Sequence, residues 1–261
     1  MGKRRTQRDI RRRTLSQNFL VGGRAIERFL SAADIQPTDL VLEIGAGTGV
    51  LTSRLAAAAG TVVAYEVDQA WSPRLTAALS SVDNVRIVFD DILKAVPPRE
   101  HFKVVGNIPF GSTAAMIGWI LSATCLQTAT VLTQLEYARK RTGYGGRWSR
   151  LTILTWPSHE WRFVSHIPRT EFRPVPRVDA AVLQIHRREP YLLSPPDLTK
   201  YEALVTLGFT GVGGSVYRTL RKQFPATLVE KARRAAALAE DTLVRDVSPQ
   251  QWLALYRDLY L

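Results

Sequence analysis

The tetrapeptide at residues 107–110, Asn107-Ile108-Pro109-Phe110, combines groups that could handle a weakly nucleophilic amine. An aromatic amine reacts poorly because its lone pair is delocalised into the ring. The Asn107 side-chain oxygen and a main-chain carbonyl of Ile108 or Pro109 can accept its two hydrogens, which orients the lone pair and stabilises the positive charge that grows on nitrogen. Pro109 stiffens the turn, and Phe110 offers a face on which a nucleobase can stack. These residues predict a site where a base amine attacks an electrophile.

A glycine loop, Gly45-x-Gly47-x-Gly49, follows the apolar run at residues 40–44. Such a turn after a strand lets the backbone approach a ligand and aims helix N–H groups at it. Dinucleotide-binding loops have their third glycine one place later, and the chain lacks a hydride-site histidine or a tyrosine-lysine pair, so a nicotinamide dehydrogenase is disfavoured. The spacing, with Glu43 before it, is typical of methyltransferases that use S-adenosylmethionine.

Carboxylates follow the next two apolar runs, at the edge of the sheet where the glycine loop would lie. Glu66 stands 23 residues after Glu43 and could accept both hydroxyl protons of a ribose. Asp68 would point to the same side. Asp90 or Asp91, after the third run, could bond an adenine amine, and the spacing alone does not choose between them. These acids fit the adenosine half of that cofactor.

Short β-rich runs alternate with helical spacing between residues 40 and 187. The expected strands cover residues 40–44, 61–66, 85–89, 102–106, 130–134, 161–167 and 180–185, and helical spacing occurs at residues 51–58 and 71–79. Strands alternating with helices predict an α/β fold with a mostly parallel, doubly wound sheet of seven strands. A proline-rich loop at residues 167–177 joins the last two strands, which we expect to form an antiparallel hairpin.

The composition changes after this sheet. The segment 187–196 is rich in proline and charge and is typical of a linker. Helical patterns follow at residues 197–207, 216–223, 228–239 and 249–259, the last with Ser248 as cap and Pro249 at the first helical position. We therefore expect a basic extension at residues 1–14, a catalytic domain at 15–187 and a small C-terminal all-helical RNA-binding domain at 188–261.

The formal charge of +12 and the pI of about 10.2 indicate a polyanionic partner. Positive charge is concentrated at residues 3–13, where seven bases stand against one acid. Arginine at this density neutralises phosphates and releases counterions, and its fork suits phosphate oxygens. A solubilising tail is the alternative interpretation. The expected RNA contacts are Arg4, Arg5, Arg8, Arg11, Arg12 and Arg13.

Other classes of function find little support. No stretch approaches the ~20 apolar residues of a membrane span, and the basic N-terminus does not have the form of a signal peptide. The single cysteine, Cys125, fits a reducing cytoplasm, where we place the protein. The four histidines lack metal-ligand spacing, so we expect no metal. We also expect a monomer, because an RNA hairpin needs open access, and packing roles for Trp119, Trp148, Trp156 and Trp161.

Four motifs, in order, resemble those of the ribosomal RNA adenine dimethyltransferases, the group that contains the Erm macrolide-resistance enzymes and the KsgA-type small-subunit enzymes. They are residues 16–20 (Ser-Gln-Asn-Phe-Leu), 42–49, 107–110 and 172–179 (Phe-Arg-Pro-Val-Pro-Arg-Val-Asp). The first and last are not general features of methyltransferases. The resemblance runs from about Arg11 to the linker. It implies a Rossmann-like class I methyltransferase fold with S-adenosylmethionine as cofactor.

The resemblance also implies roles for single residues. Glu66 would hold the ribose, and Asp91 rather than Asp90 would hold the adenine. Phe172 would stack on a flipped base opposite Phe110. Gly45 would contact the methionine portion of the cofactor, and Asn107 would contact both cofactor and target amine. The full set of cofactor contacts would be Asn18, Leu20, Gly45, Gly47, Glu66, Asp91 and Asn107.

Three features favour the Erm branch over the KsgA branch. They are serine before Gln17, Asn-Ile-Pro-Phe in place of Asn-Leu-Pro-Tyr, and the arginine-rich extension. The implied activity is methylation or dimethylation of the N6 amine of an adenine in a 23S ribosomal RNA hairpin, which would confer resistance to macrolides, lincosamides and streptogramin B. The alternatives are a KsgA-like 16S RNA enzyme of ribosome maturation and a non-catalytic RNA-binding factor.

Overall fold

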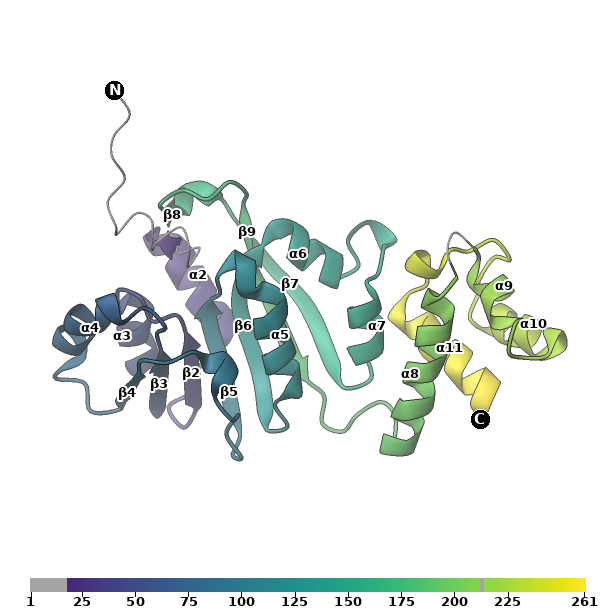
Figure 1. Ribbon diagram of the computed structural model, residues 1–261, viewed down its shortest axis with the longest axis horizontal. Coiled ribbons are helices and arrows are strands. Elements are labelled where there is room, and N and C mark those ends of the chain that lie inside the picture. Colours follow the sequence, from purple (N-terminus) through teal and green to yellow (C-terminus); the bar gives the residue numbers. More distant parts are fainter. Residues whose placement is uncertain (1–17, 212–213) are drawn as a thin grey trace, which may run out of the picture. The chain divides into compact units, whose positions relative to one another are not determined.

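The computed structural model describes residues 18–211 and 214–261, which fall into two compact units (Figure 1). The sheet unit comprises the described chain up to Leu135 together with Phe163–His186, and the helical unit comprises Glu136–Arg162 and Arg187–Leu261. Residues 136–162, which we expected in the catalytic domain, thus group with the C-terminal helices. The expected RNA contacts Arg4, Arg5, Arg8, Arg11, Arg12 and Arg13 lie outside the described residues.

Seven strands form the main sheet in the order β4-β3-β2-β5-β6-β9-β7. The strands from β4 to β6 are parallel, and β9 runs antiparallel to β6. The predicted α/β class is confirmed, and each expected strand is present, with β6 and β7 beginning earlier than predicted. The bounds are β2 (Leu40–Ile44), β3 (Thr61–Tyr65), β4 (Val85–Val88), β5 (Phe102–Asn107), β6 (Leu126–Gln134), β7 (His159–Ile167) and β9 (Ala180–Arg187).

Helices pack against this sheet through apolar stripes of helical period. α2 (Gly23–Ala33) buries Ala25, Ile26, Phe29 and Ala33, whose spacing places them on one helical face. These side chains share a core with strand residues such as Val41 and Val62, which are fully buried. The remaining helices of this unit are α3 (Val50–Ala56), α4 (Ser72–Leu79) and α5 (Thr113–Ser122).

The chain changes its direction of winding at β2. It moves outward through β3 and β4 and then crosses to β5 on the other side of β2. At such a switch point the loops that leave the two central strands diverge and form a crevice outside their carboxyl ends. Ile44 of β2 lies in register with Gly106 of β5. The glycine loop after Ile44 and the tetrapeptide that begins at Asn107 therefore meet at one edge of the sheet.

A second, two-stranded sheet joins segments that are far apart in the sequence. β1 (Phe19–Leu20) pairs antiparallel with β8 (Phe172–Arg173), with Phe19 opposite Arg173 and Leu20 opposite Phe172. We expected the region around β8 to be loop. The pairing brings two of the four sequence motifs side by side.

The helical unit has a core of its own. Trp252, Tyr201 and Tyr256 are fully buried there, and no helix among the described residues is long and apolar enough to cross a membrane. The predicted start of the last helix is confirmed, since the Ser248 side chain and that of Gln251 form a reciprocal capping box. The helices are α6 (Leu135–Arg141), α7 (Arg150–Thr155), α8 (Pro195–Phe209), α9 (Val216–Leu220), α10 (Ala226–Ala235) and α11 (Pro249–Tyr260).

Candidate active site

The glycine loop is a turn that requires left-handed backbone. Gly45, Gly47 and Gly49 have φ values of 78°, 52° and 81°. The backbone N–H groups of Gly45 and Ala46 both donate to the carbonyl of Tyr65 at the end of β3, at 2.9 and 3.0 Å. A Cβ atom on Gly47 would lie 2.6 Å from the Phe19 ring. Glycine is therefore needed at this position for both conformation and space.

Glu66 fastens this loop to the end of β3. Glu66 is only 3% exposed. One of its carboxylate oxygens accepts a hydrogen bond from the Gly47 N–H and the other from the Asp68 N–H, both at 2.8 Å. Burial raises the pKa of Glu66, and the two N–H groups oppose this rise. Each oxygen keeps a further lone pair, so the carboxylate fits the two hydroxyls of a ribose.

The Asp68 carboxylate has a different hydrogen-bond partner from that of Glu66. Its carboxylate accepts the N–H of Ala70 and caps the short helix η1 (Gln69–Trp71). This local task distinguishes it from Glu66, whose carboxylate lies against the glycine turn. The role of Glu66 at a ribose stays a prediction.

Glu43 is the most deeply buried acid of the site. It lies at the end of β2 and is 0% exposed. Burial raises its pKa to about 7; the Thr52 hydroxyl opposes that rise, and the charge of Glu66 adds to it. In the sequence Glu43 stands out only as part of the glycine-loop motif, because no local pattern shows that its carboxyl is shielded from water.

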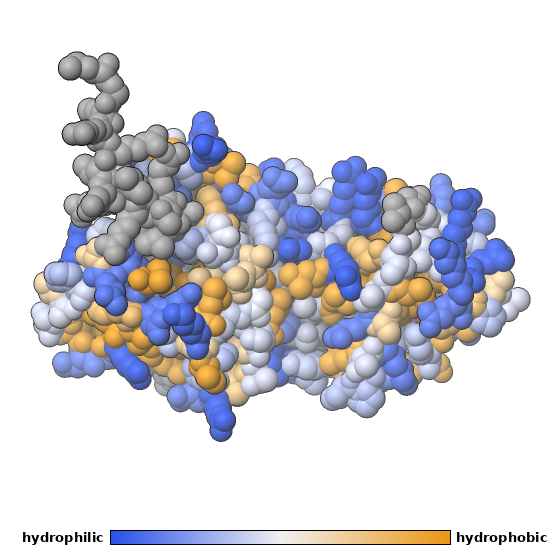
Figure 2. Space-filling model, viewed as in Figure 1, coloured by the Kyte–Doolittle hydropathy of each residue, from blue (hydrophilic) through white to orange (hydrophobic). Residues whose placement is uncertain are grey.

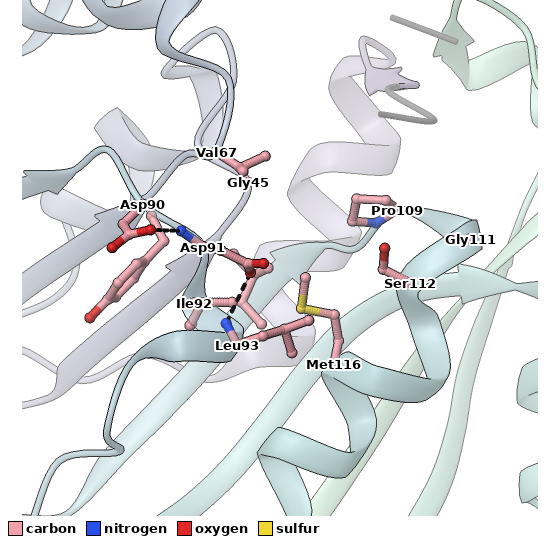
Figure 3. A pocket seen from close by; sticks show the side chains of 12 residues that line it. Gly45, Val67, Asp90, Asp91, Ile92, Leu93, Pro109, Gly111, Ser112 and Met116 are labelled. Atoms are coloured by element: carbon pink, nitrogen blue, oxygen red, sulfur yellow. Dashed lines mark hydrogen bonds between the residues drawn. The ribbon is translucent and has the colours of Figure 1, made fainter. Parts of the chain in front are cut away.

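A pocket of about 340 Å³ opens beside these groups. Figure 3 shows Asp90 and Asp91 on one side and Pro109, Ser112 and Met116 on the other. The Asp91 side chain extends toward the pocket (Figure 3) and caps η2 (Ile92–Lys94) by accepting the Leu93 N–H at 3.0 Å. Val67, which is 52% exposed, also lines the pocket and adds an apolar wall that sequence analysis missed.

Asp90 makes other contacts. Its Oδ1 accepts the N–H of Asp91 at 2.7 Å and lies 3.5 Å from Lys94 Nζ. The Asp91 N–H, and after it the Lys94 charge, lower the pKa of Asp90. Both acids line the pocket, but their hydrogen bonds differ: the Asp90 carboxylate is turned to the Asp91 N–H, whereas the Asp91 carboxylate caps η2.

Asn107 ends β5 and is held from the N-terminal segment. Its Nδ2 donates to the main-chain carbonyl of Asn18 at 2.6 Å. This bond orients the amide, and among the described residues none donates a hydrogen bond to its Oδ1. Ile108 is almost fully buried, whereas Pro109 lines the pocket. The Pro109 carbonyl already accepts the Ser112 N–H at 3.0 Å within the turn η3 (Phe110–Ser112).

Residues 18–20 pack beside the glycine loop and Asn107. The Phe19 ring lies over Gly47 and packs edge-on against Trp71, with centroids 5.0 Å apart. Leu20 points into the core and is 7% exposed. Of the seven predicted cofactor contacts, Gly45 and Asp91 line the pocket. Gly47 is joined to Glu66 by a hydrogen bond and Asn107 to Asn18 by another, whereas Leu20 packs in the core. No sequence signal distinguished Phe19, which contacts the glycine turn, from its neighbours.

The two predicted stacking residues differ in exposure. Phe110 is half-buried against the core, whereas Phe172 is 0% exposed and packs in the core next to Leu20. Stacking of Phe172 on a base would require β8 to shift from the position described. Its role stays a prediction. No cluster of three or more potential metal ligands occurs in the described part of the chain.

Known proteins resemble this chain along most of its length. A family model for ribosomal RNA adenine dimethylase matches residues 8–260. An rRNA adenine N-6-methyltransferase of Streptomyces fradiae is 49% identical over 254 residues, covering 95% of this chain and 78% of the relative. A mycinamicin-resistance protein of Micromonospora griseorubida is 35% identical over 247 residues, covering 94% and 78%.

A solved structure has the same fold over nearly the whole chain. The crystal structure of the 23S rRNA methyltransferase ErmE superposes with a TM-score of 0.90 at 44% sequence identity, covering 93% of this chain and 100% of ErmE. The likeness therefore extends over both units, which agrees with the span of the family match.

Proposed function

The chain belongs to the ribosomal RNA adenine dimethylase family, and on that premise we propose that it methylates the N6 amine of an adenine in 23S ribosomal RNA, with S-adenosylmethionine as methyl donor. The observation that carries this proposal is the position of Asn107, at the switch point between the glycine loop and the pocket. The names of the relatives, an rRNA adenine N-6-methyltransferase and a 23S rRNA methyltransferase, support the substrate.

The residues of the crevice fit the cofactor. Glu66 would accept the ribose hydroxyls, Asp91 the adenine amine, and the turn at Gly45 and Gly47 would admit the methionine portion close to the backbone. Asn18 and Leu20 would cover this portion from the N-terminal segment. When bound, the cofactor supplies an electrophilic methyl group.

The target amine needs two acceptors, and the geometry favours a particular pair. The Asn107 Oδ1 is one, because Nδ2 is already committed to Asn18. Spacing left Ile108 and Pro109 as candidates for the second. The Pro109 carbonyl already accepts two hydrogen bonds, from the Ser112 N–H at 3.0 Å and from the Thr113 hydroxyl at 3.4 Å. These use both of its lone pairs, so we assign this role to the carbonyl of Ile108. The adenine ring would stack on Phe110, and no base is needed, since the product ammonium loses its proton readily.

The biological consequence follows from the site of methylation. An added methyl on this adenine would block macrolides, lincosamides and streptogramin B, and the mycinamicin-resistance relative agrees with that phenotype. We further propose that the protein acts as a cytoplasmic monomer, and that residues 1–14 and the helical unit grip an RNA hairpin.

Methyl transfer from labelled S-adenosylmethionine to purified, unmodified 23S RNA tests the proposal, with 16S RNA assayed alongside and the modified base mapped. We expect label in N6-methylated adenine of 23S RNA alone. Label in 16S RNA alone would instead assign the protein to ribosome maturation. No transfer to either RNA, with cofactor bound normally in calorimetry, would contradict the assigned reaction.

A further inference from the structure

The loop between α6 and α7 of the helical unit presents an aromatic ring to solvent. Tyr144, in the short turn η4 (Tyr144–Gly146), is 64% exposed, the highest value among the aromatic side chains described. A single exposed apolar side chain is ordinary on a protein surface. Its surroundings decide whether it has a function.

The Tyr144 ring is held rather than loose. The Arg139 guanidinium lies over it, with its carbon 4.4 Å from the ring centroid. Gly143, Gly145 and Gly146 adopt φ values of 71°, 66° and 75°, and the Gly146 N–H donates to the Gly143 carbonyl at 3.0 Å. One face of the ring is thus covered by a cation and the other is open to a ligand.

The base of this loop is fixed to the helical unit by other residues. Arg141 Nη1 donates to Ser149 Oγ at 2.7 Å, and the Trp148 N–H donates to the Arg245 carbonyl at 2.7 Å. The Trp148 ring packs against Trp156, with centroids 5.9 Å apart, which confirms its predicted packing role. Arg141 and Trp148 therefore make contacts that hold the helical unit together, whereas the Tyr144 side chain stays mostly exposed to solvent.

Positive residues flank Tyr144 in the sequence of this loop. Lys140, Arg147 and Arg150 are exposed, and Glu136 is the one acid between residues 135 and 150. Neither Lys140 nor Arg147 forms an ion pair within the described ranges 18–211 and 214–261. Arg150 donates to the Thr206 hydroxyl. Figure 2 shows hydrophilic side chains gathered where this loop reaches the surface.

We propose that Tyr144, backed by Arg139, is a stacking platform for an unpaired base of the RNA substrate, with Lys140 and Arg147 neutralising the flanking phosphates. Unpaired bases offer a free π face to an aromatic ring, whereas a duplex hides it. An acidic protein segment could pair with the two cations but would have no use for the open ring. This inference rests on the proposed function, and it adds a contact made by the helical unit to the contacts at the methylated adenine.

The test compares Tyr144→Ala with Tyr144→Phe in the full chain, by equilibrium binding to unmodified 23S RNA over a range of salt. Loss of one stacked base should weaken binding about tenfold in Tyr144→Ala. The phenyl ring should keep binding within about twofold of the wild type. The salt slope should not change in either variant, because no phosphate contact is removed. Lys140→Gln with Arg147→Gln should lower that slope by about 1.4, or 0.7 for each single-stranded phosphate contact.

Three results would overturn the inference. These are wild-type affinity in Tyr144→Ala, equal losses in both Tyr144 variants, and a loss on assembled ribosomal subunits but not on naked RNA, which would assign the surface to a protein partner. S-adenosylmethionine affinity and thermal unfolding of Tyr144→Ala should match the wild type. If the wild type methylates 23S RNA while Tyr144→Ala binds normally, only this inference fails. If the wild type transfers no methyl group, the proposed function fails instead.

Discussion

At the scale of single residues, Asn107 has two tasks in one amide. Its Nδ2 donates to the Asn18 carbonyl at 2.6 Å, which leaves Oδ1 as the acceptor that the proposed function assigns to the target amine. The orientation matters because charge develops on the amine nitrogen only during transfer, and a preoriented acceptor needs no rearrangement at that moment.

Asn107→Ala removes this acceptor and should lower kcat for methyl transfer by about 100-fold or more. Affinity for RNA should stay within a few-fold, because phosphate contacts dominate binding. Single-turnover transfer and RNA-binding assays on the same preparation would check both points. Turnover near the wild-type level would refute the role assigned to Asn107.

Glu43 adds a pH dependence of stability. Its carboxyl has a pKa of about 7 in the folded chain, against an ordinary value of 4.5. Between these values the folded state holds a proton that the unfolded state has lost. The stabilisation that the protonated Glu43 carboxyl contributes is therefore complete below pH 4.5. It falls by about 1.4 kcal/mol per pH unit between pH 4.5 and pH 7 and is lost above pH 7.

Glu43→Gln should remove this decline, because glutamine has a similar shape and does not titrate. Relative to the wild type, the variant should gain about 3 kcal/mol in the free energy of unfolding between pH 4.5 and pH 8. Urea unfolding at several pH values measures the difference. Parallel curves for the two proteins would show that Glu43 does not titrate in this range.

At the scale of elements, the β1–β8 ribbon and the glycine loop depend on one another. β8 holds β1 in place, β1 places the Phe19 ring over Gly47, and the Asn18 carbonyl next to it holds Asn107. Two elements of only two residues each thereby connect the glycine loop with the Asn107 tetrapeptide.

Gly47→Ala should disturb this arrangement at its tightest point. The new Cβ would meet the Phe19 ring at 2.6 Å, on a backbone with φ of 52°. S-adenosylmethionine binding should weaken at least tenfold, because the ring must move and the turn must distort. Calorimetric titration with the cofactor measures this effect.

Gly145→Ala is the matched control, since Gly145 also has a positive φ, of 66°, but has nothing within 4 Å of a Cβ position. It should show only the backbone cost, about 1 kcal/mol of stability, and normal cofactor affinity. Equal cofactor affinities in the two alanine variants would contradict the steric argument.

At the scale of the whole molecule, the predicted reaction site and the exposed basic loop belong to different units. The sheet unit gathers the predicted cofactor and target residues, whereas the helical unit has its own aromatic core and an exposed basic loop. The net charge of +12 includes the basic residues of the N-terminal segment. RNA binding by that segment stays a prediction, because it lies outside the described residues.

Deletion of residues 2–13 should weaken RNA binding and flatten its salt dependence, since seven bases and one acid are removed. The measurement is log Kd against log salt concentration for the full and shortened chains. Cofactor affinity should be unchanged and serves as the control for folding. An unchanged salt slope would favour the interpretation of the segment as a solubilising tail.

Much of the fold could be predicted because its signals are local. Each strand of the main sheet is a short apolar run bounded by polar or turn residues, and Ser248-Pro249 marks the start of α11 through capping chemistry that needs no tertiary contact. The crevice could be predicted too, because parallel strands place the residues after them at one edge. We expected residues 136–162 in the catalytic domain, whereas they group with the C-terminal helices. This grouping depends on tertiary contacts, since side chains such as Ile153 enter the core of the helical unit.

The sequence by itself determined the sheet, the glycine loop and the place of the Asn107 tetrapeptide after β5, because periodicity and spacing along the chain encode them. Only the tertiary structure decided that β1 pairs with β8 about 150 residues away, that Phe172 is buried, and that Asp91 faces the pocket. The same holds for the Pro109 carbonyl, which is engaged within η3. These features depend on which hydrogen-bond partners and packing neighbours the fold brings together, and no spacing in one sequence records that outcome.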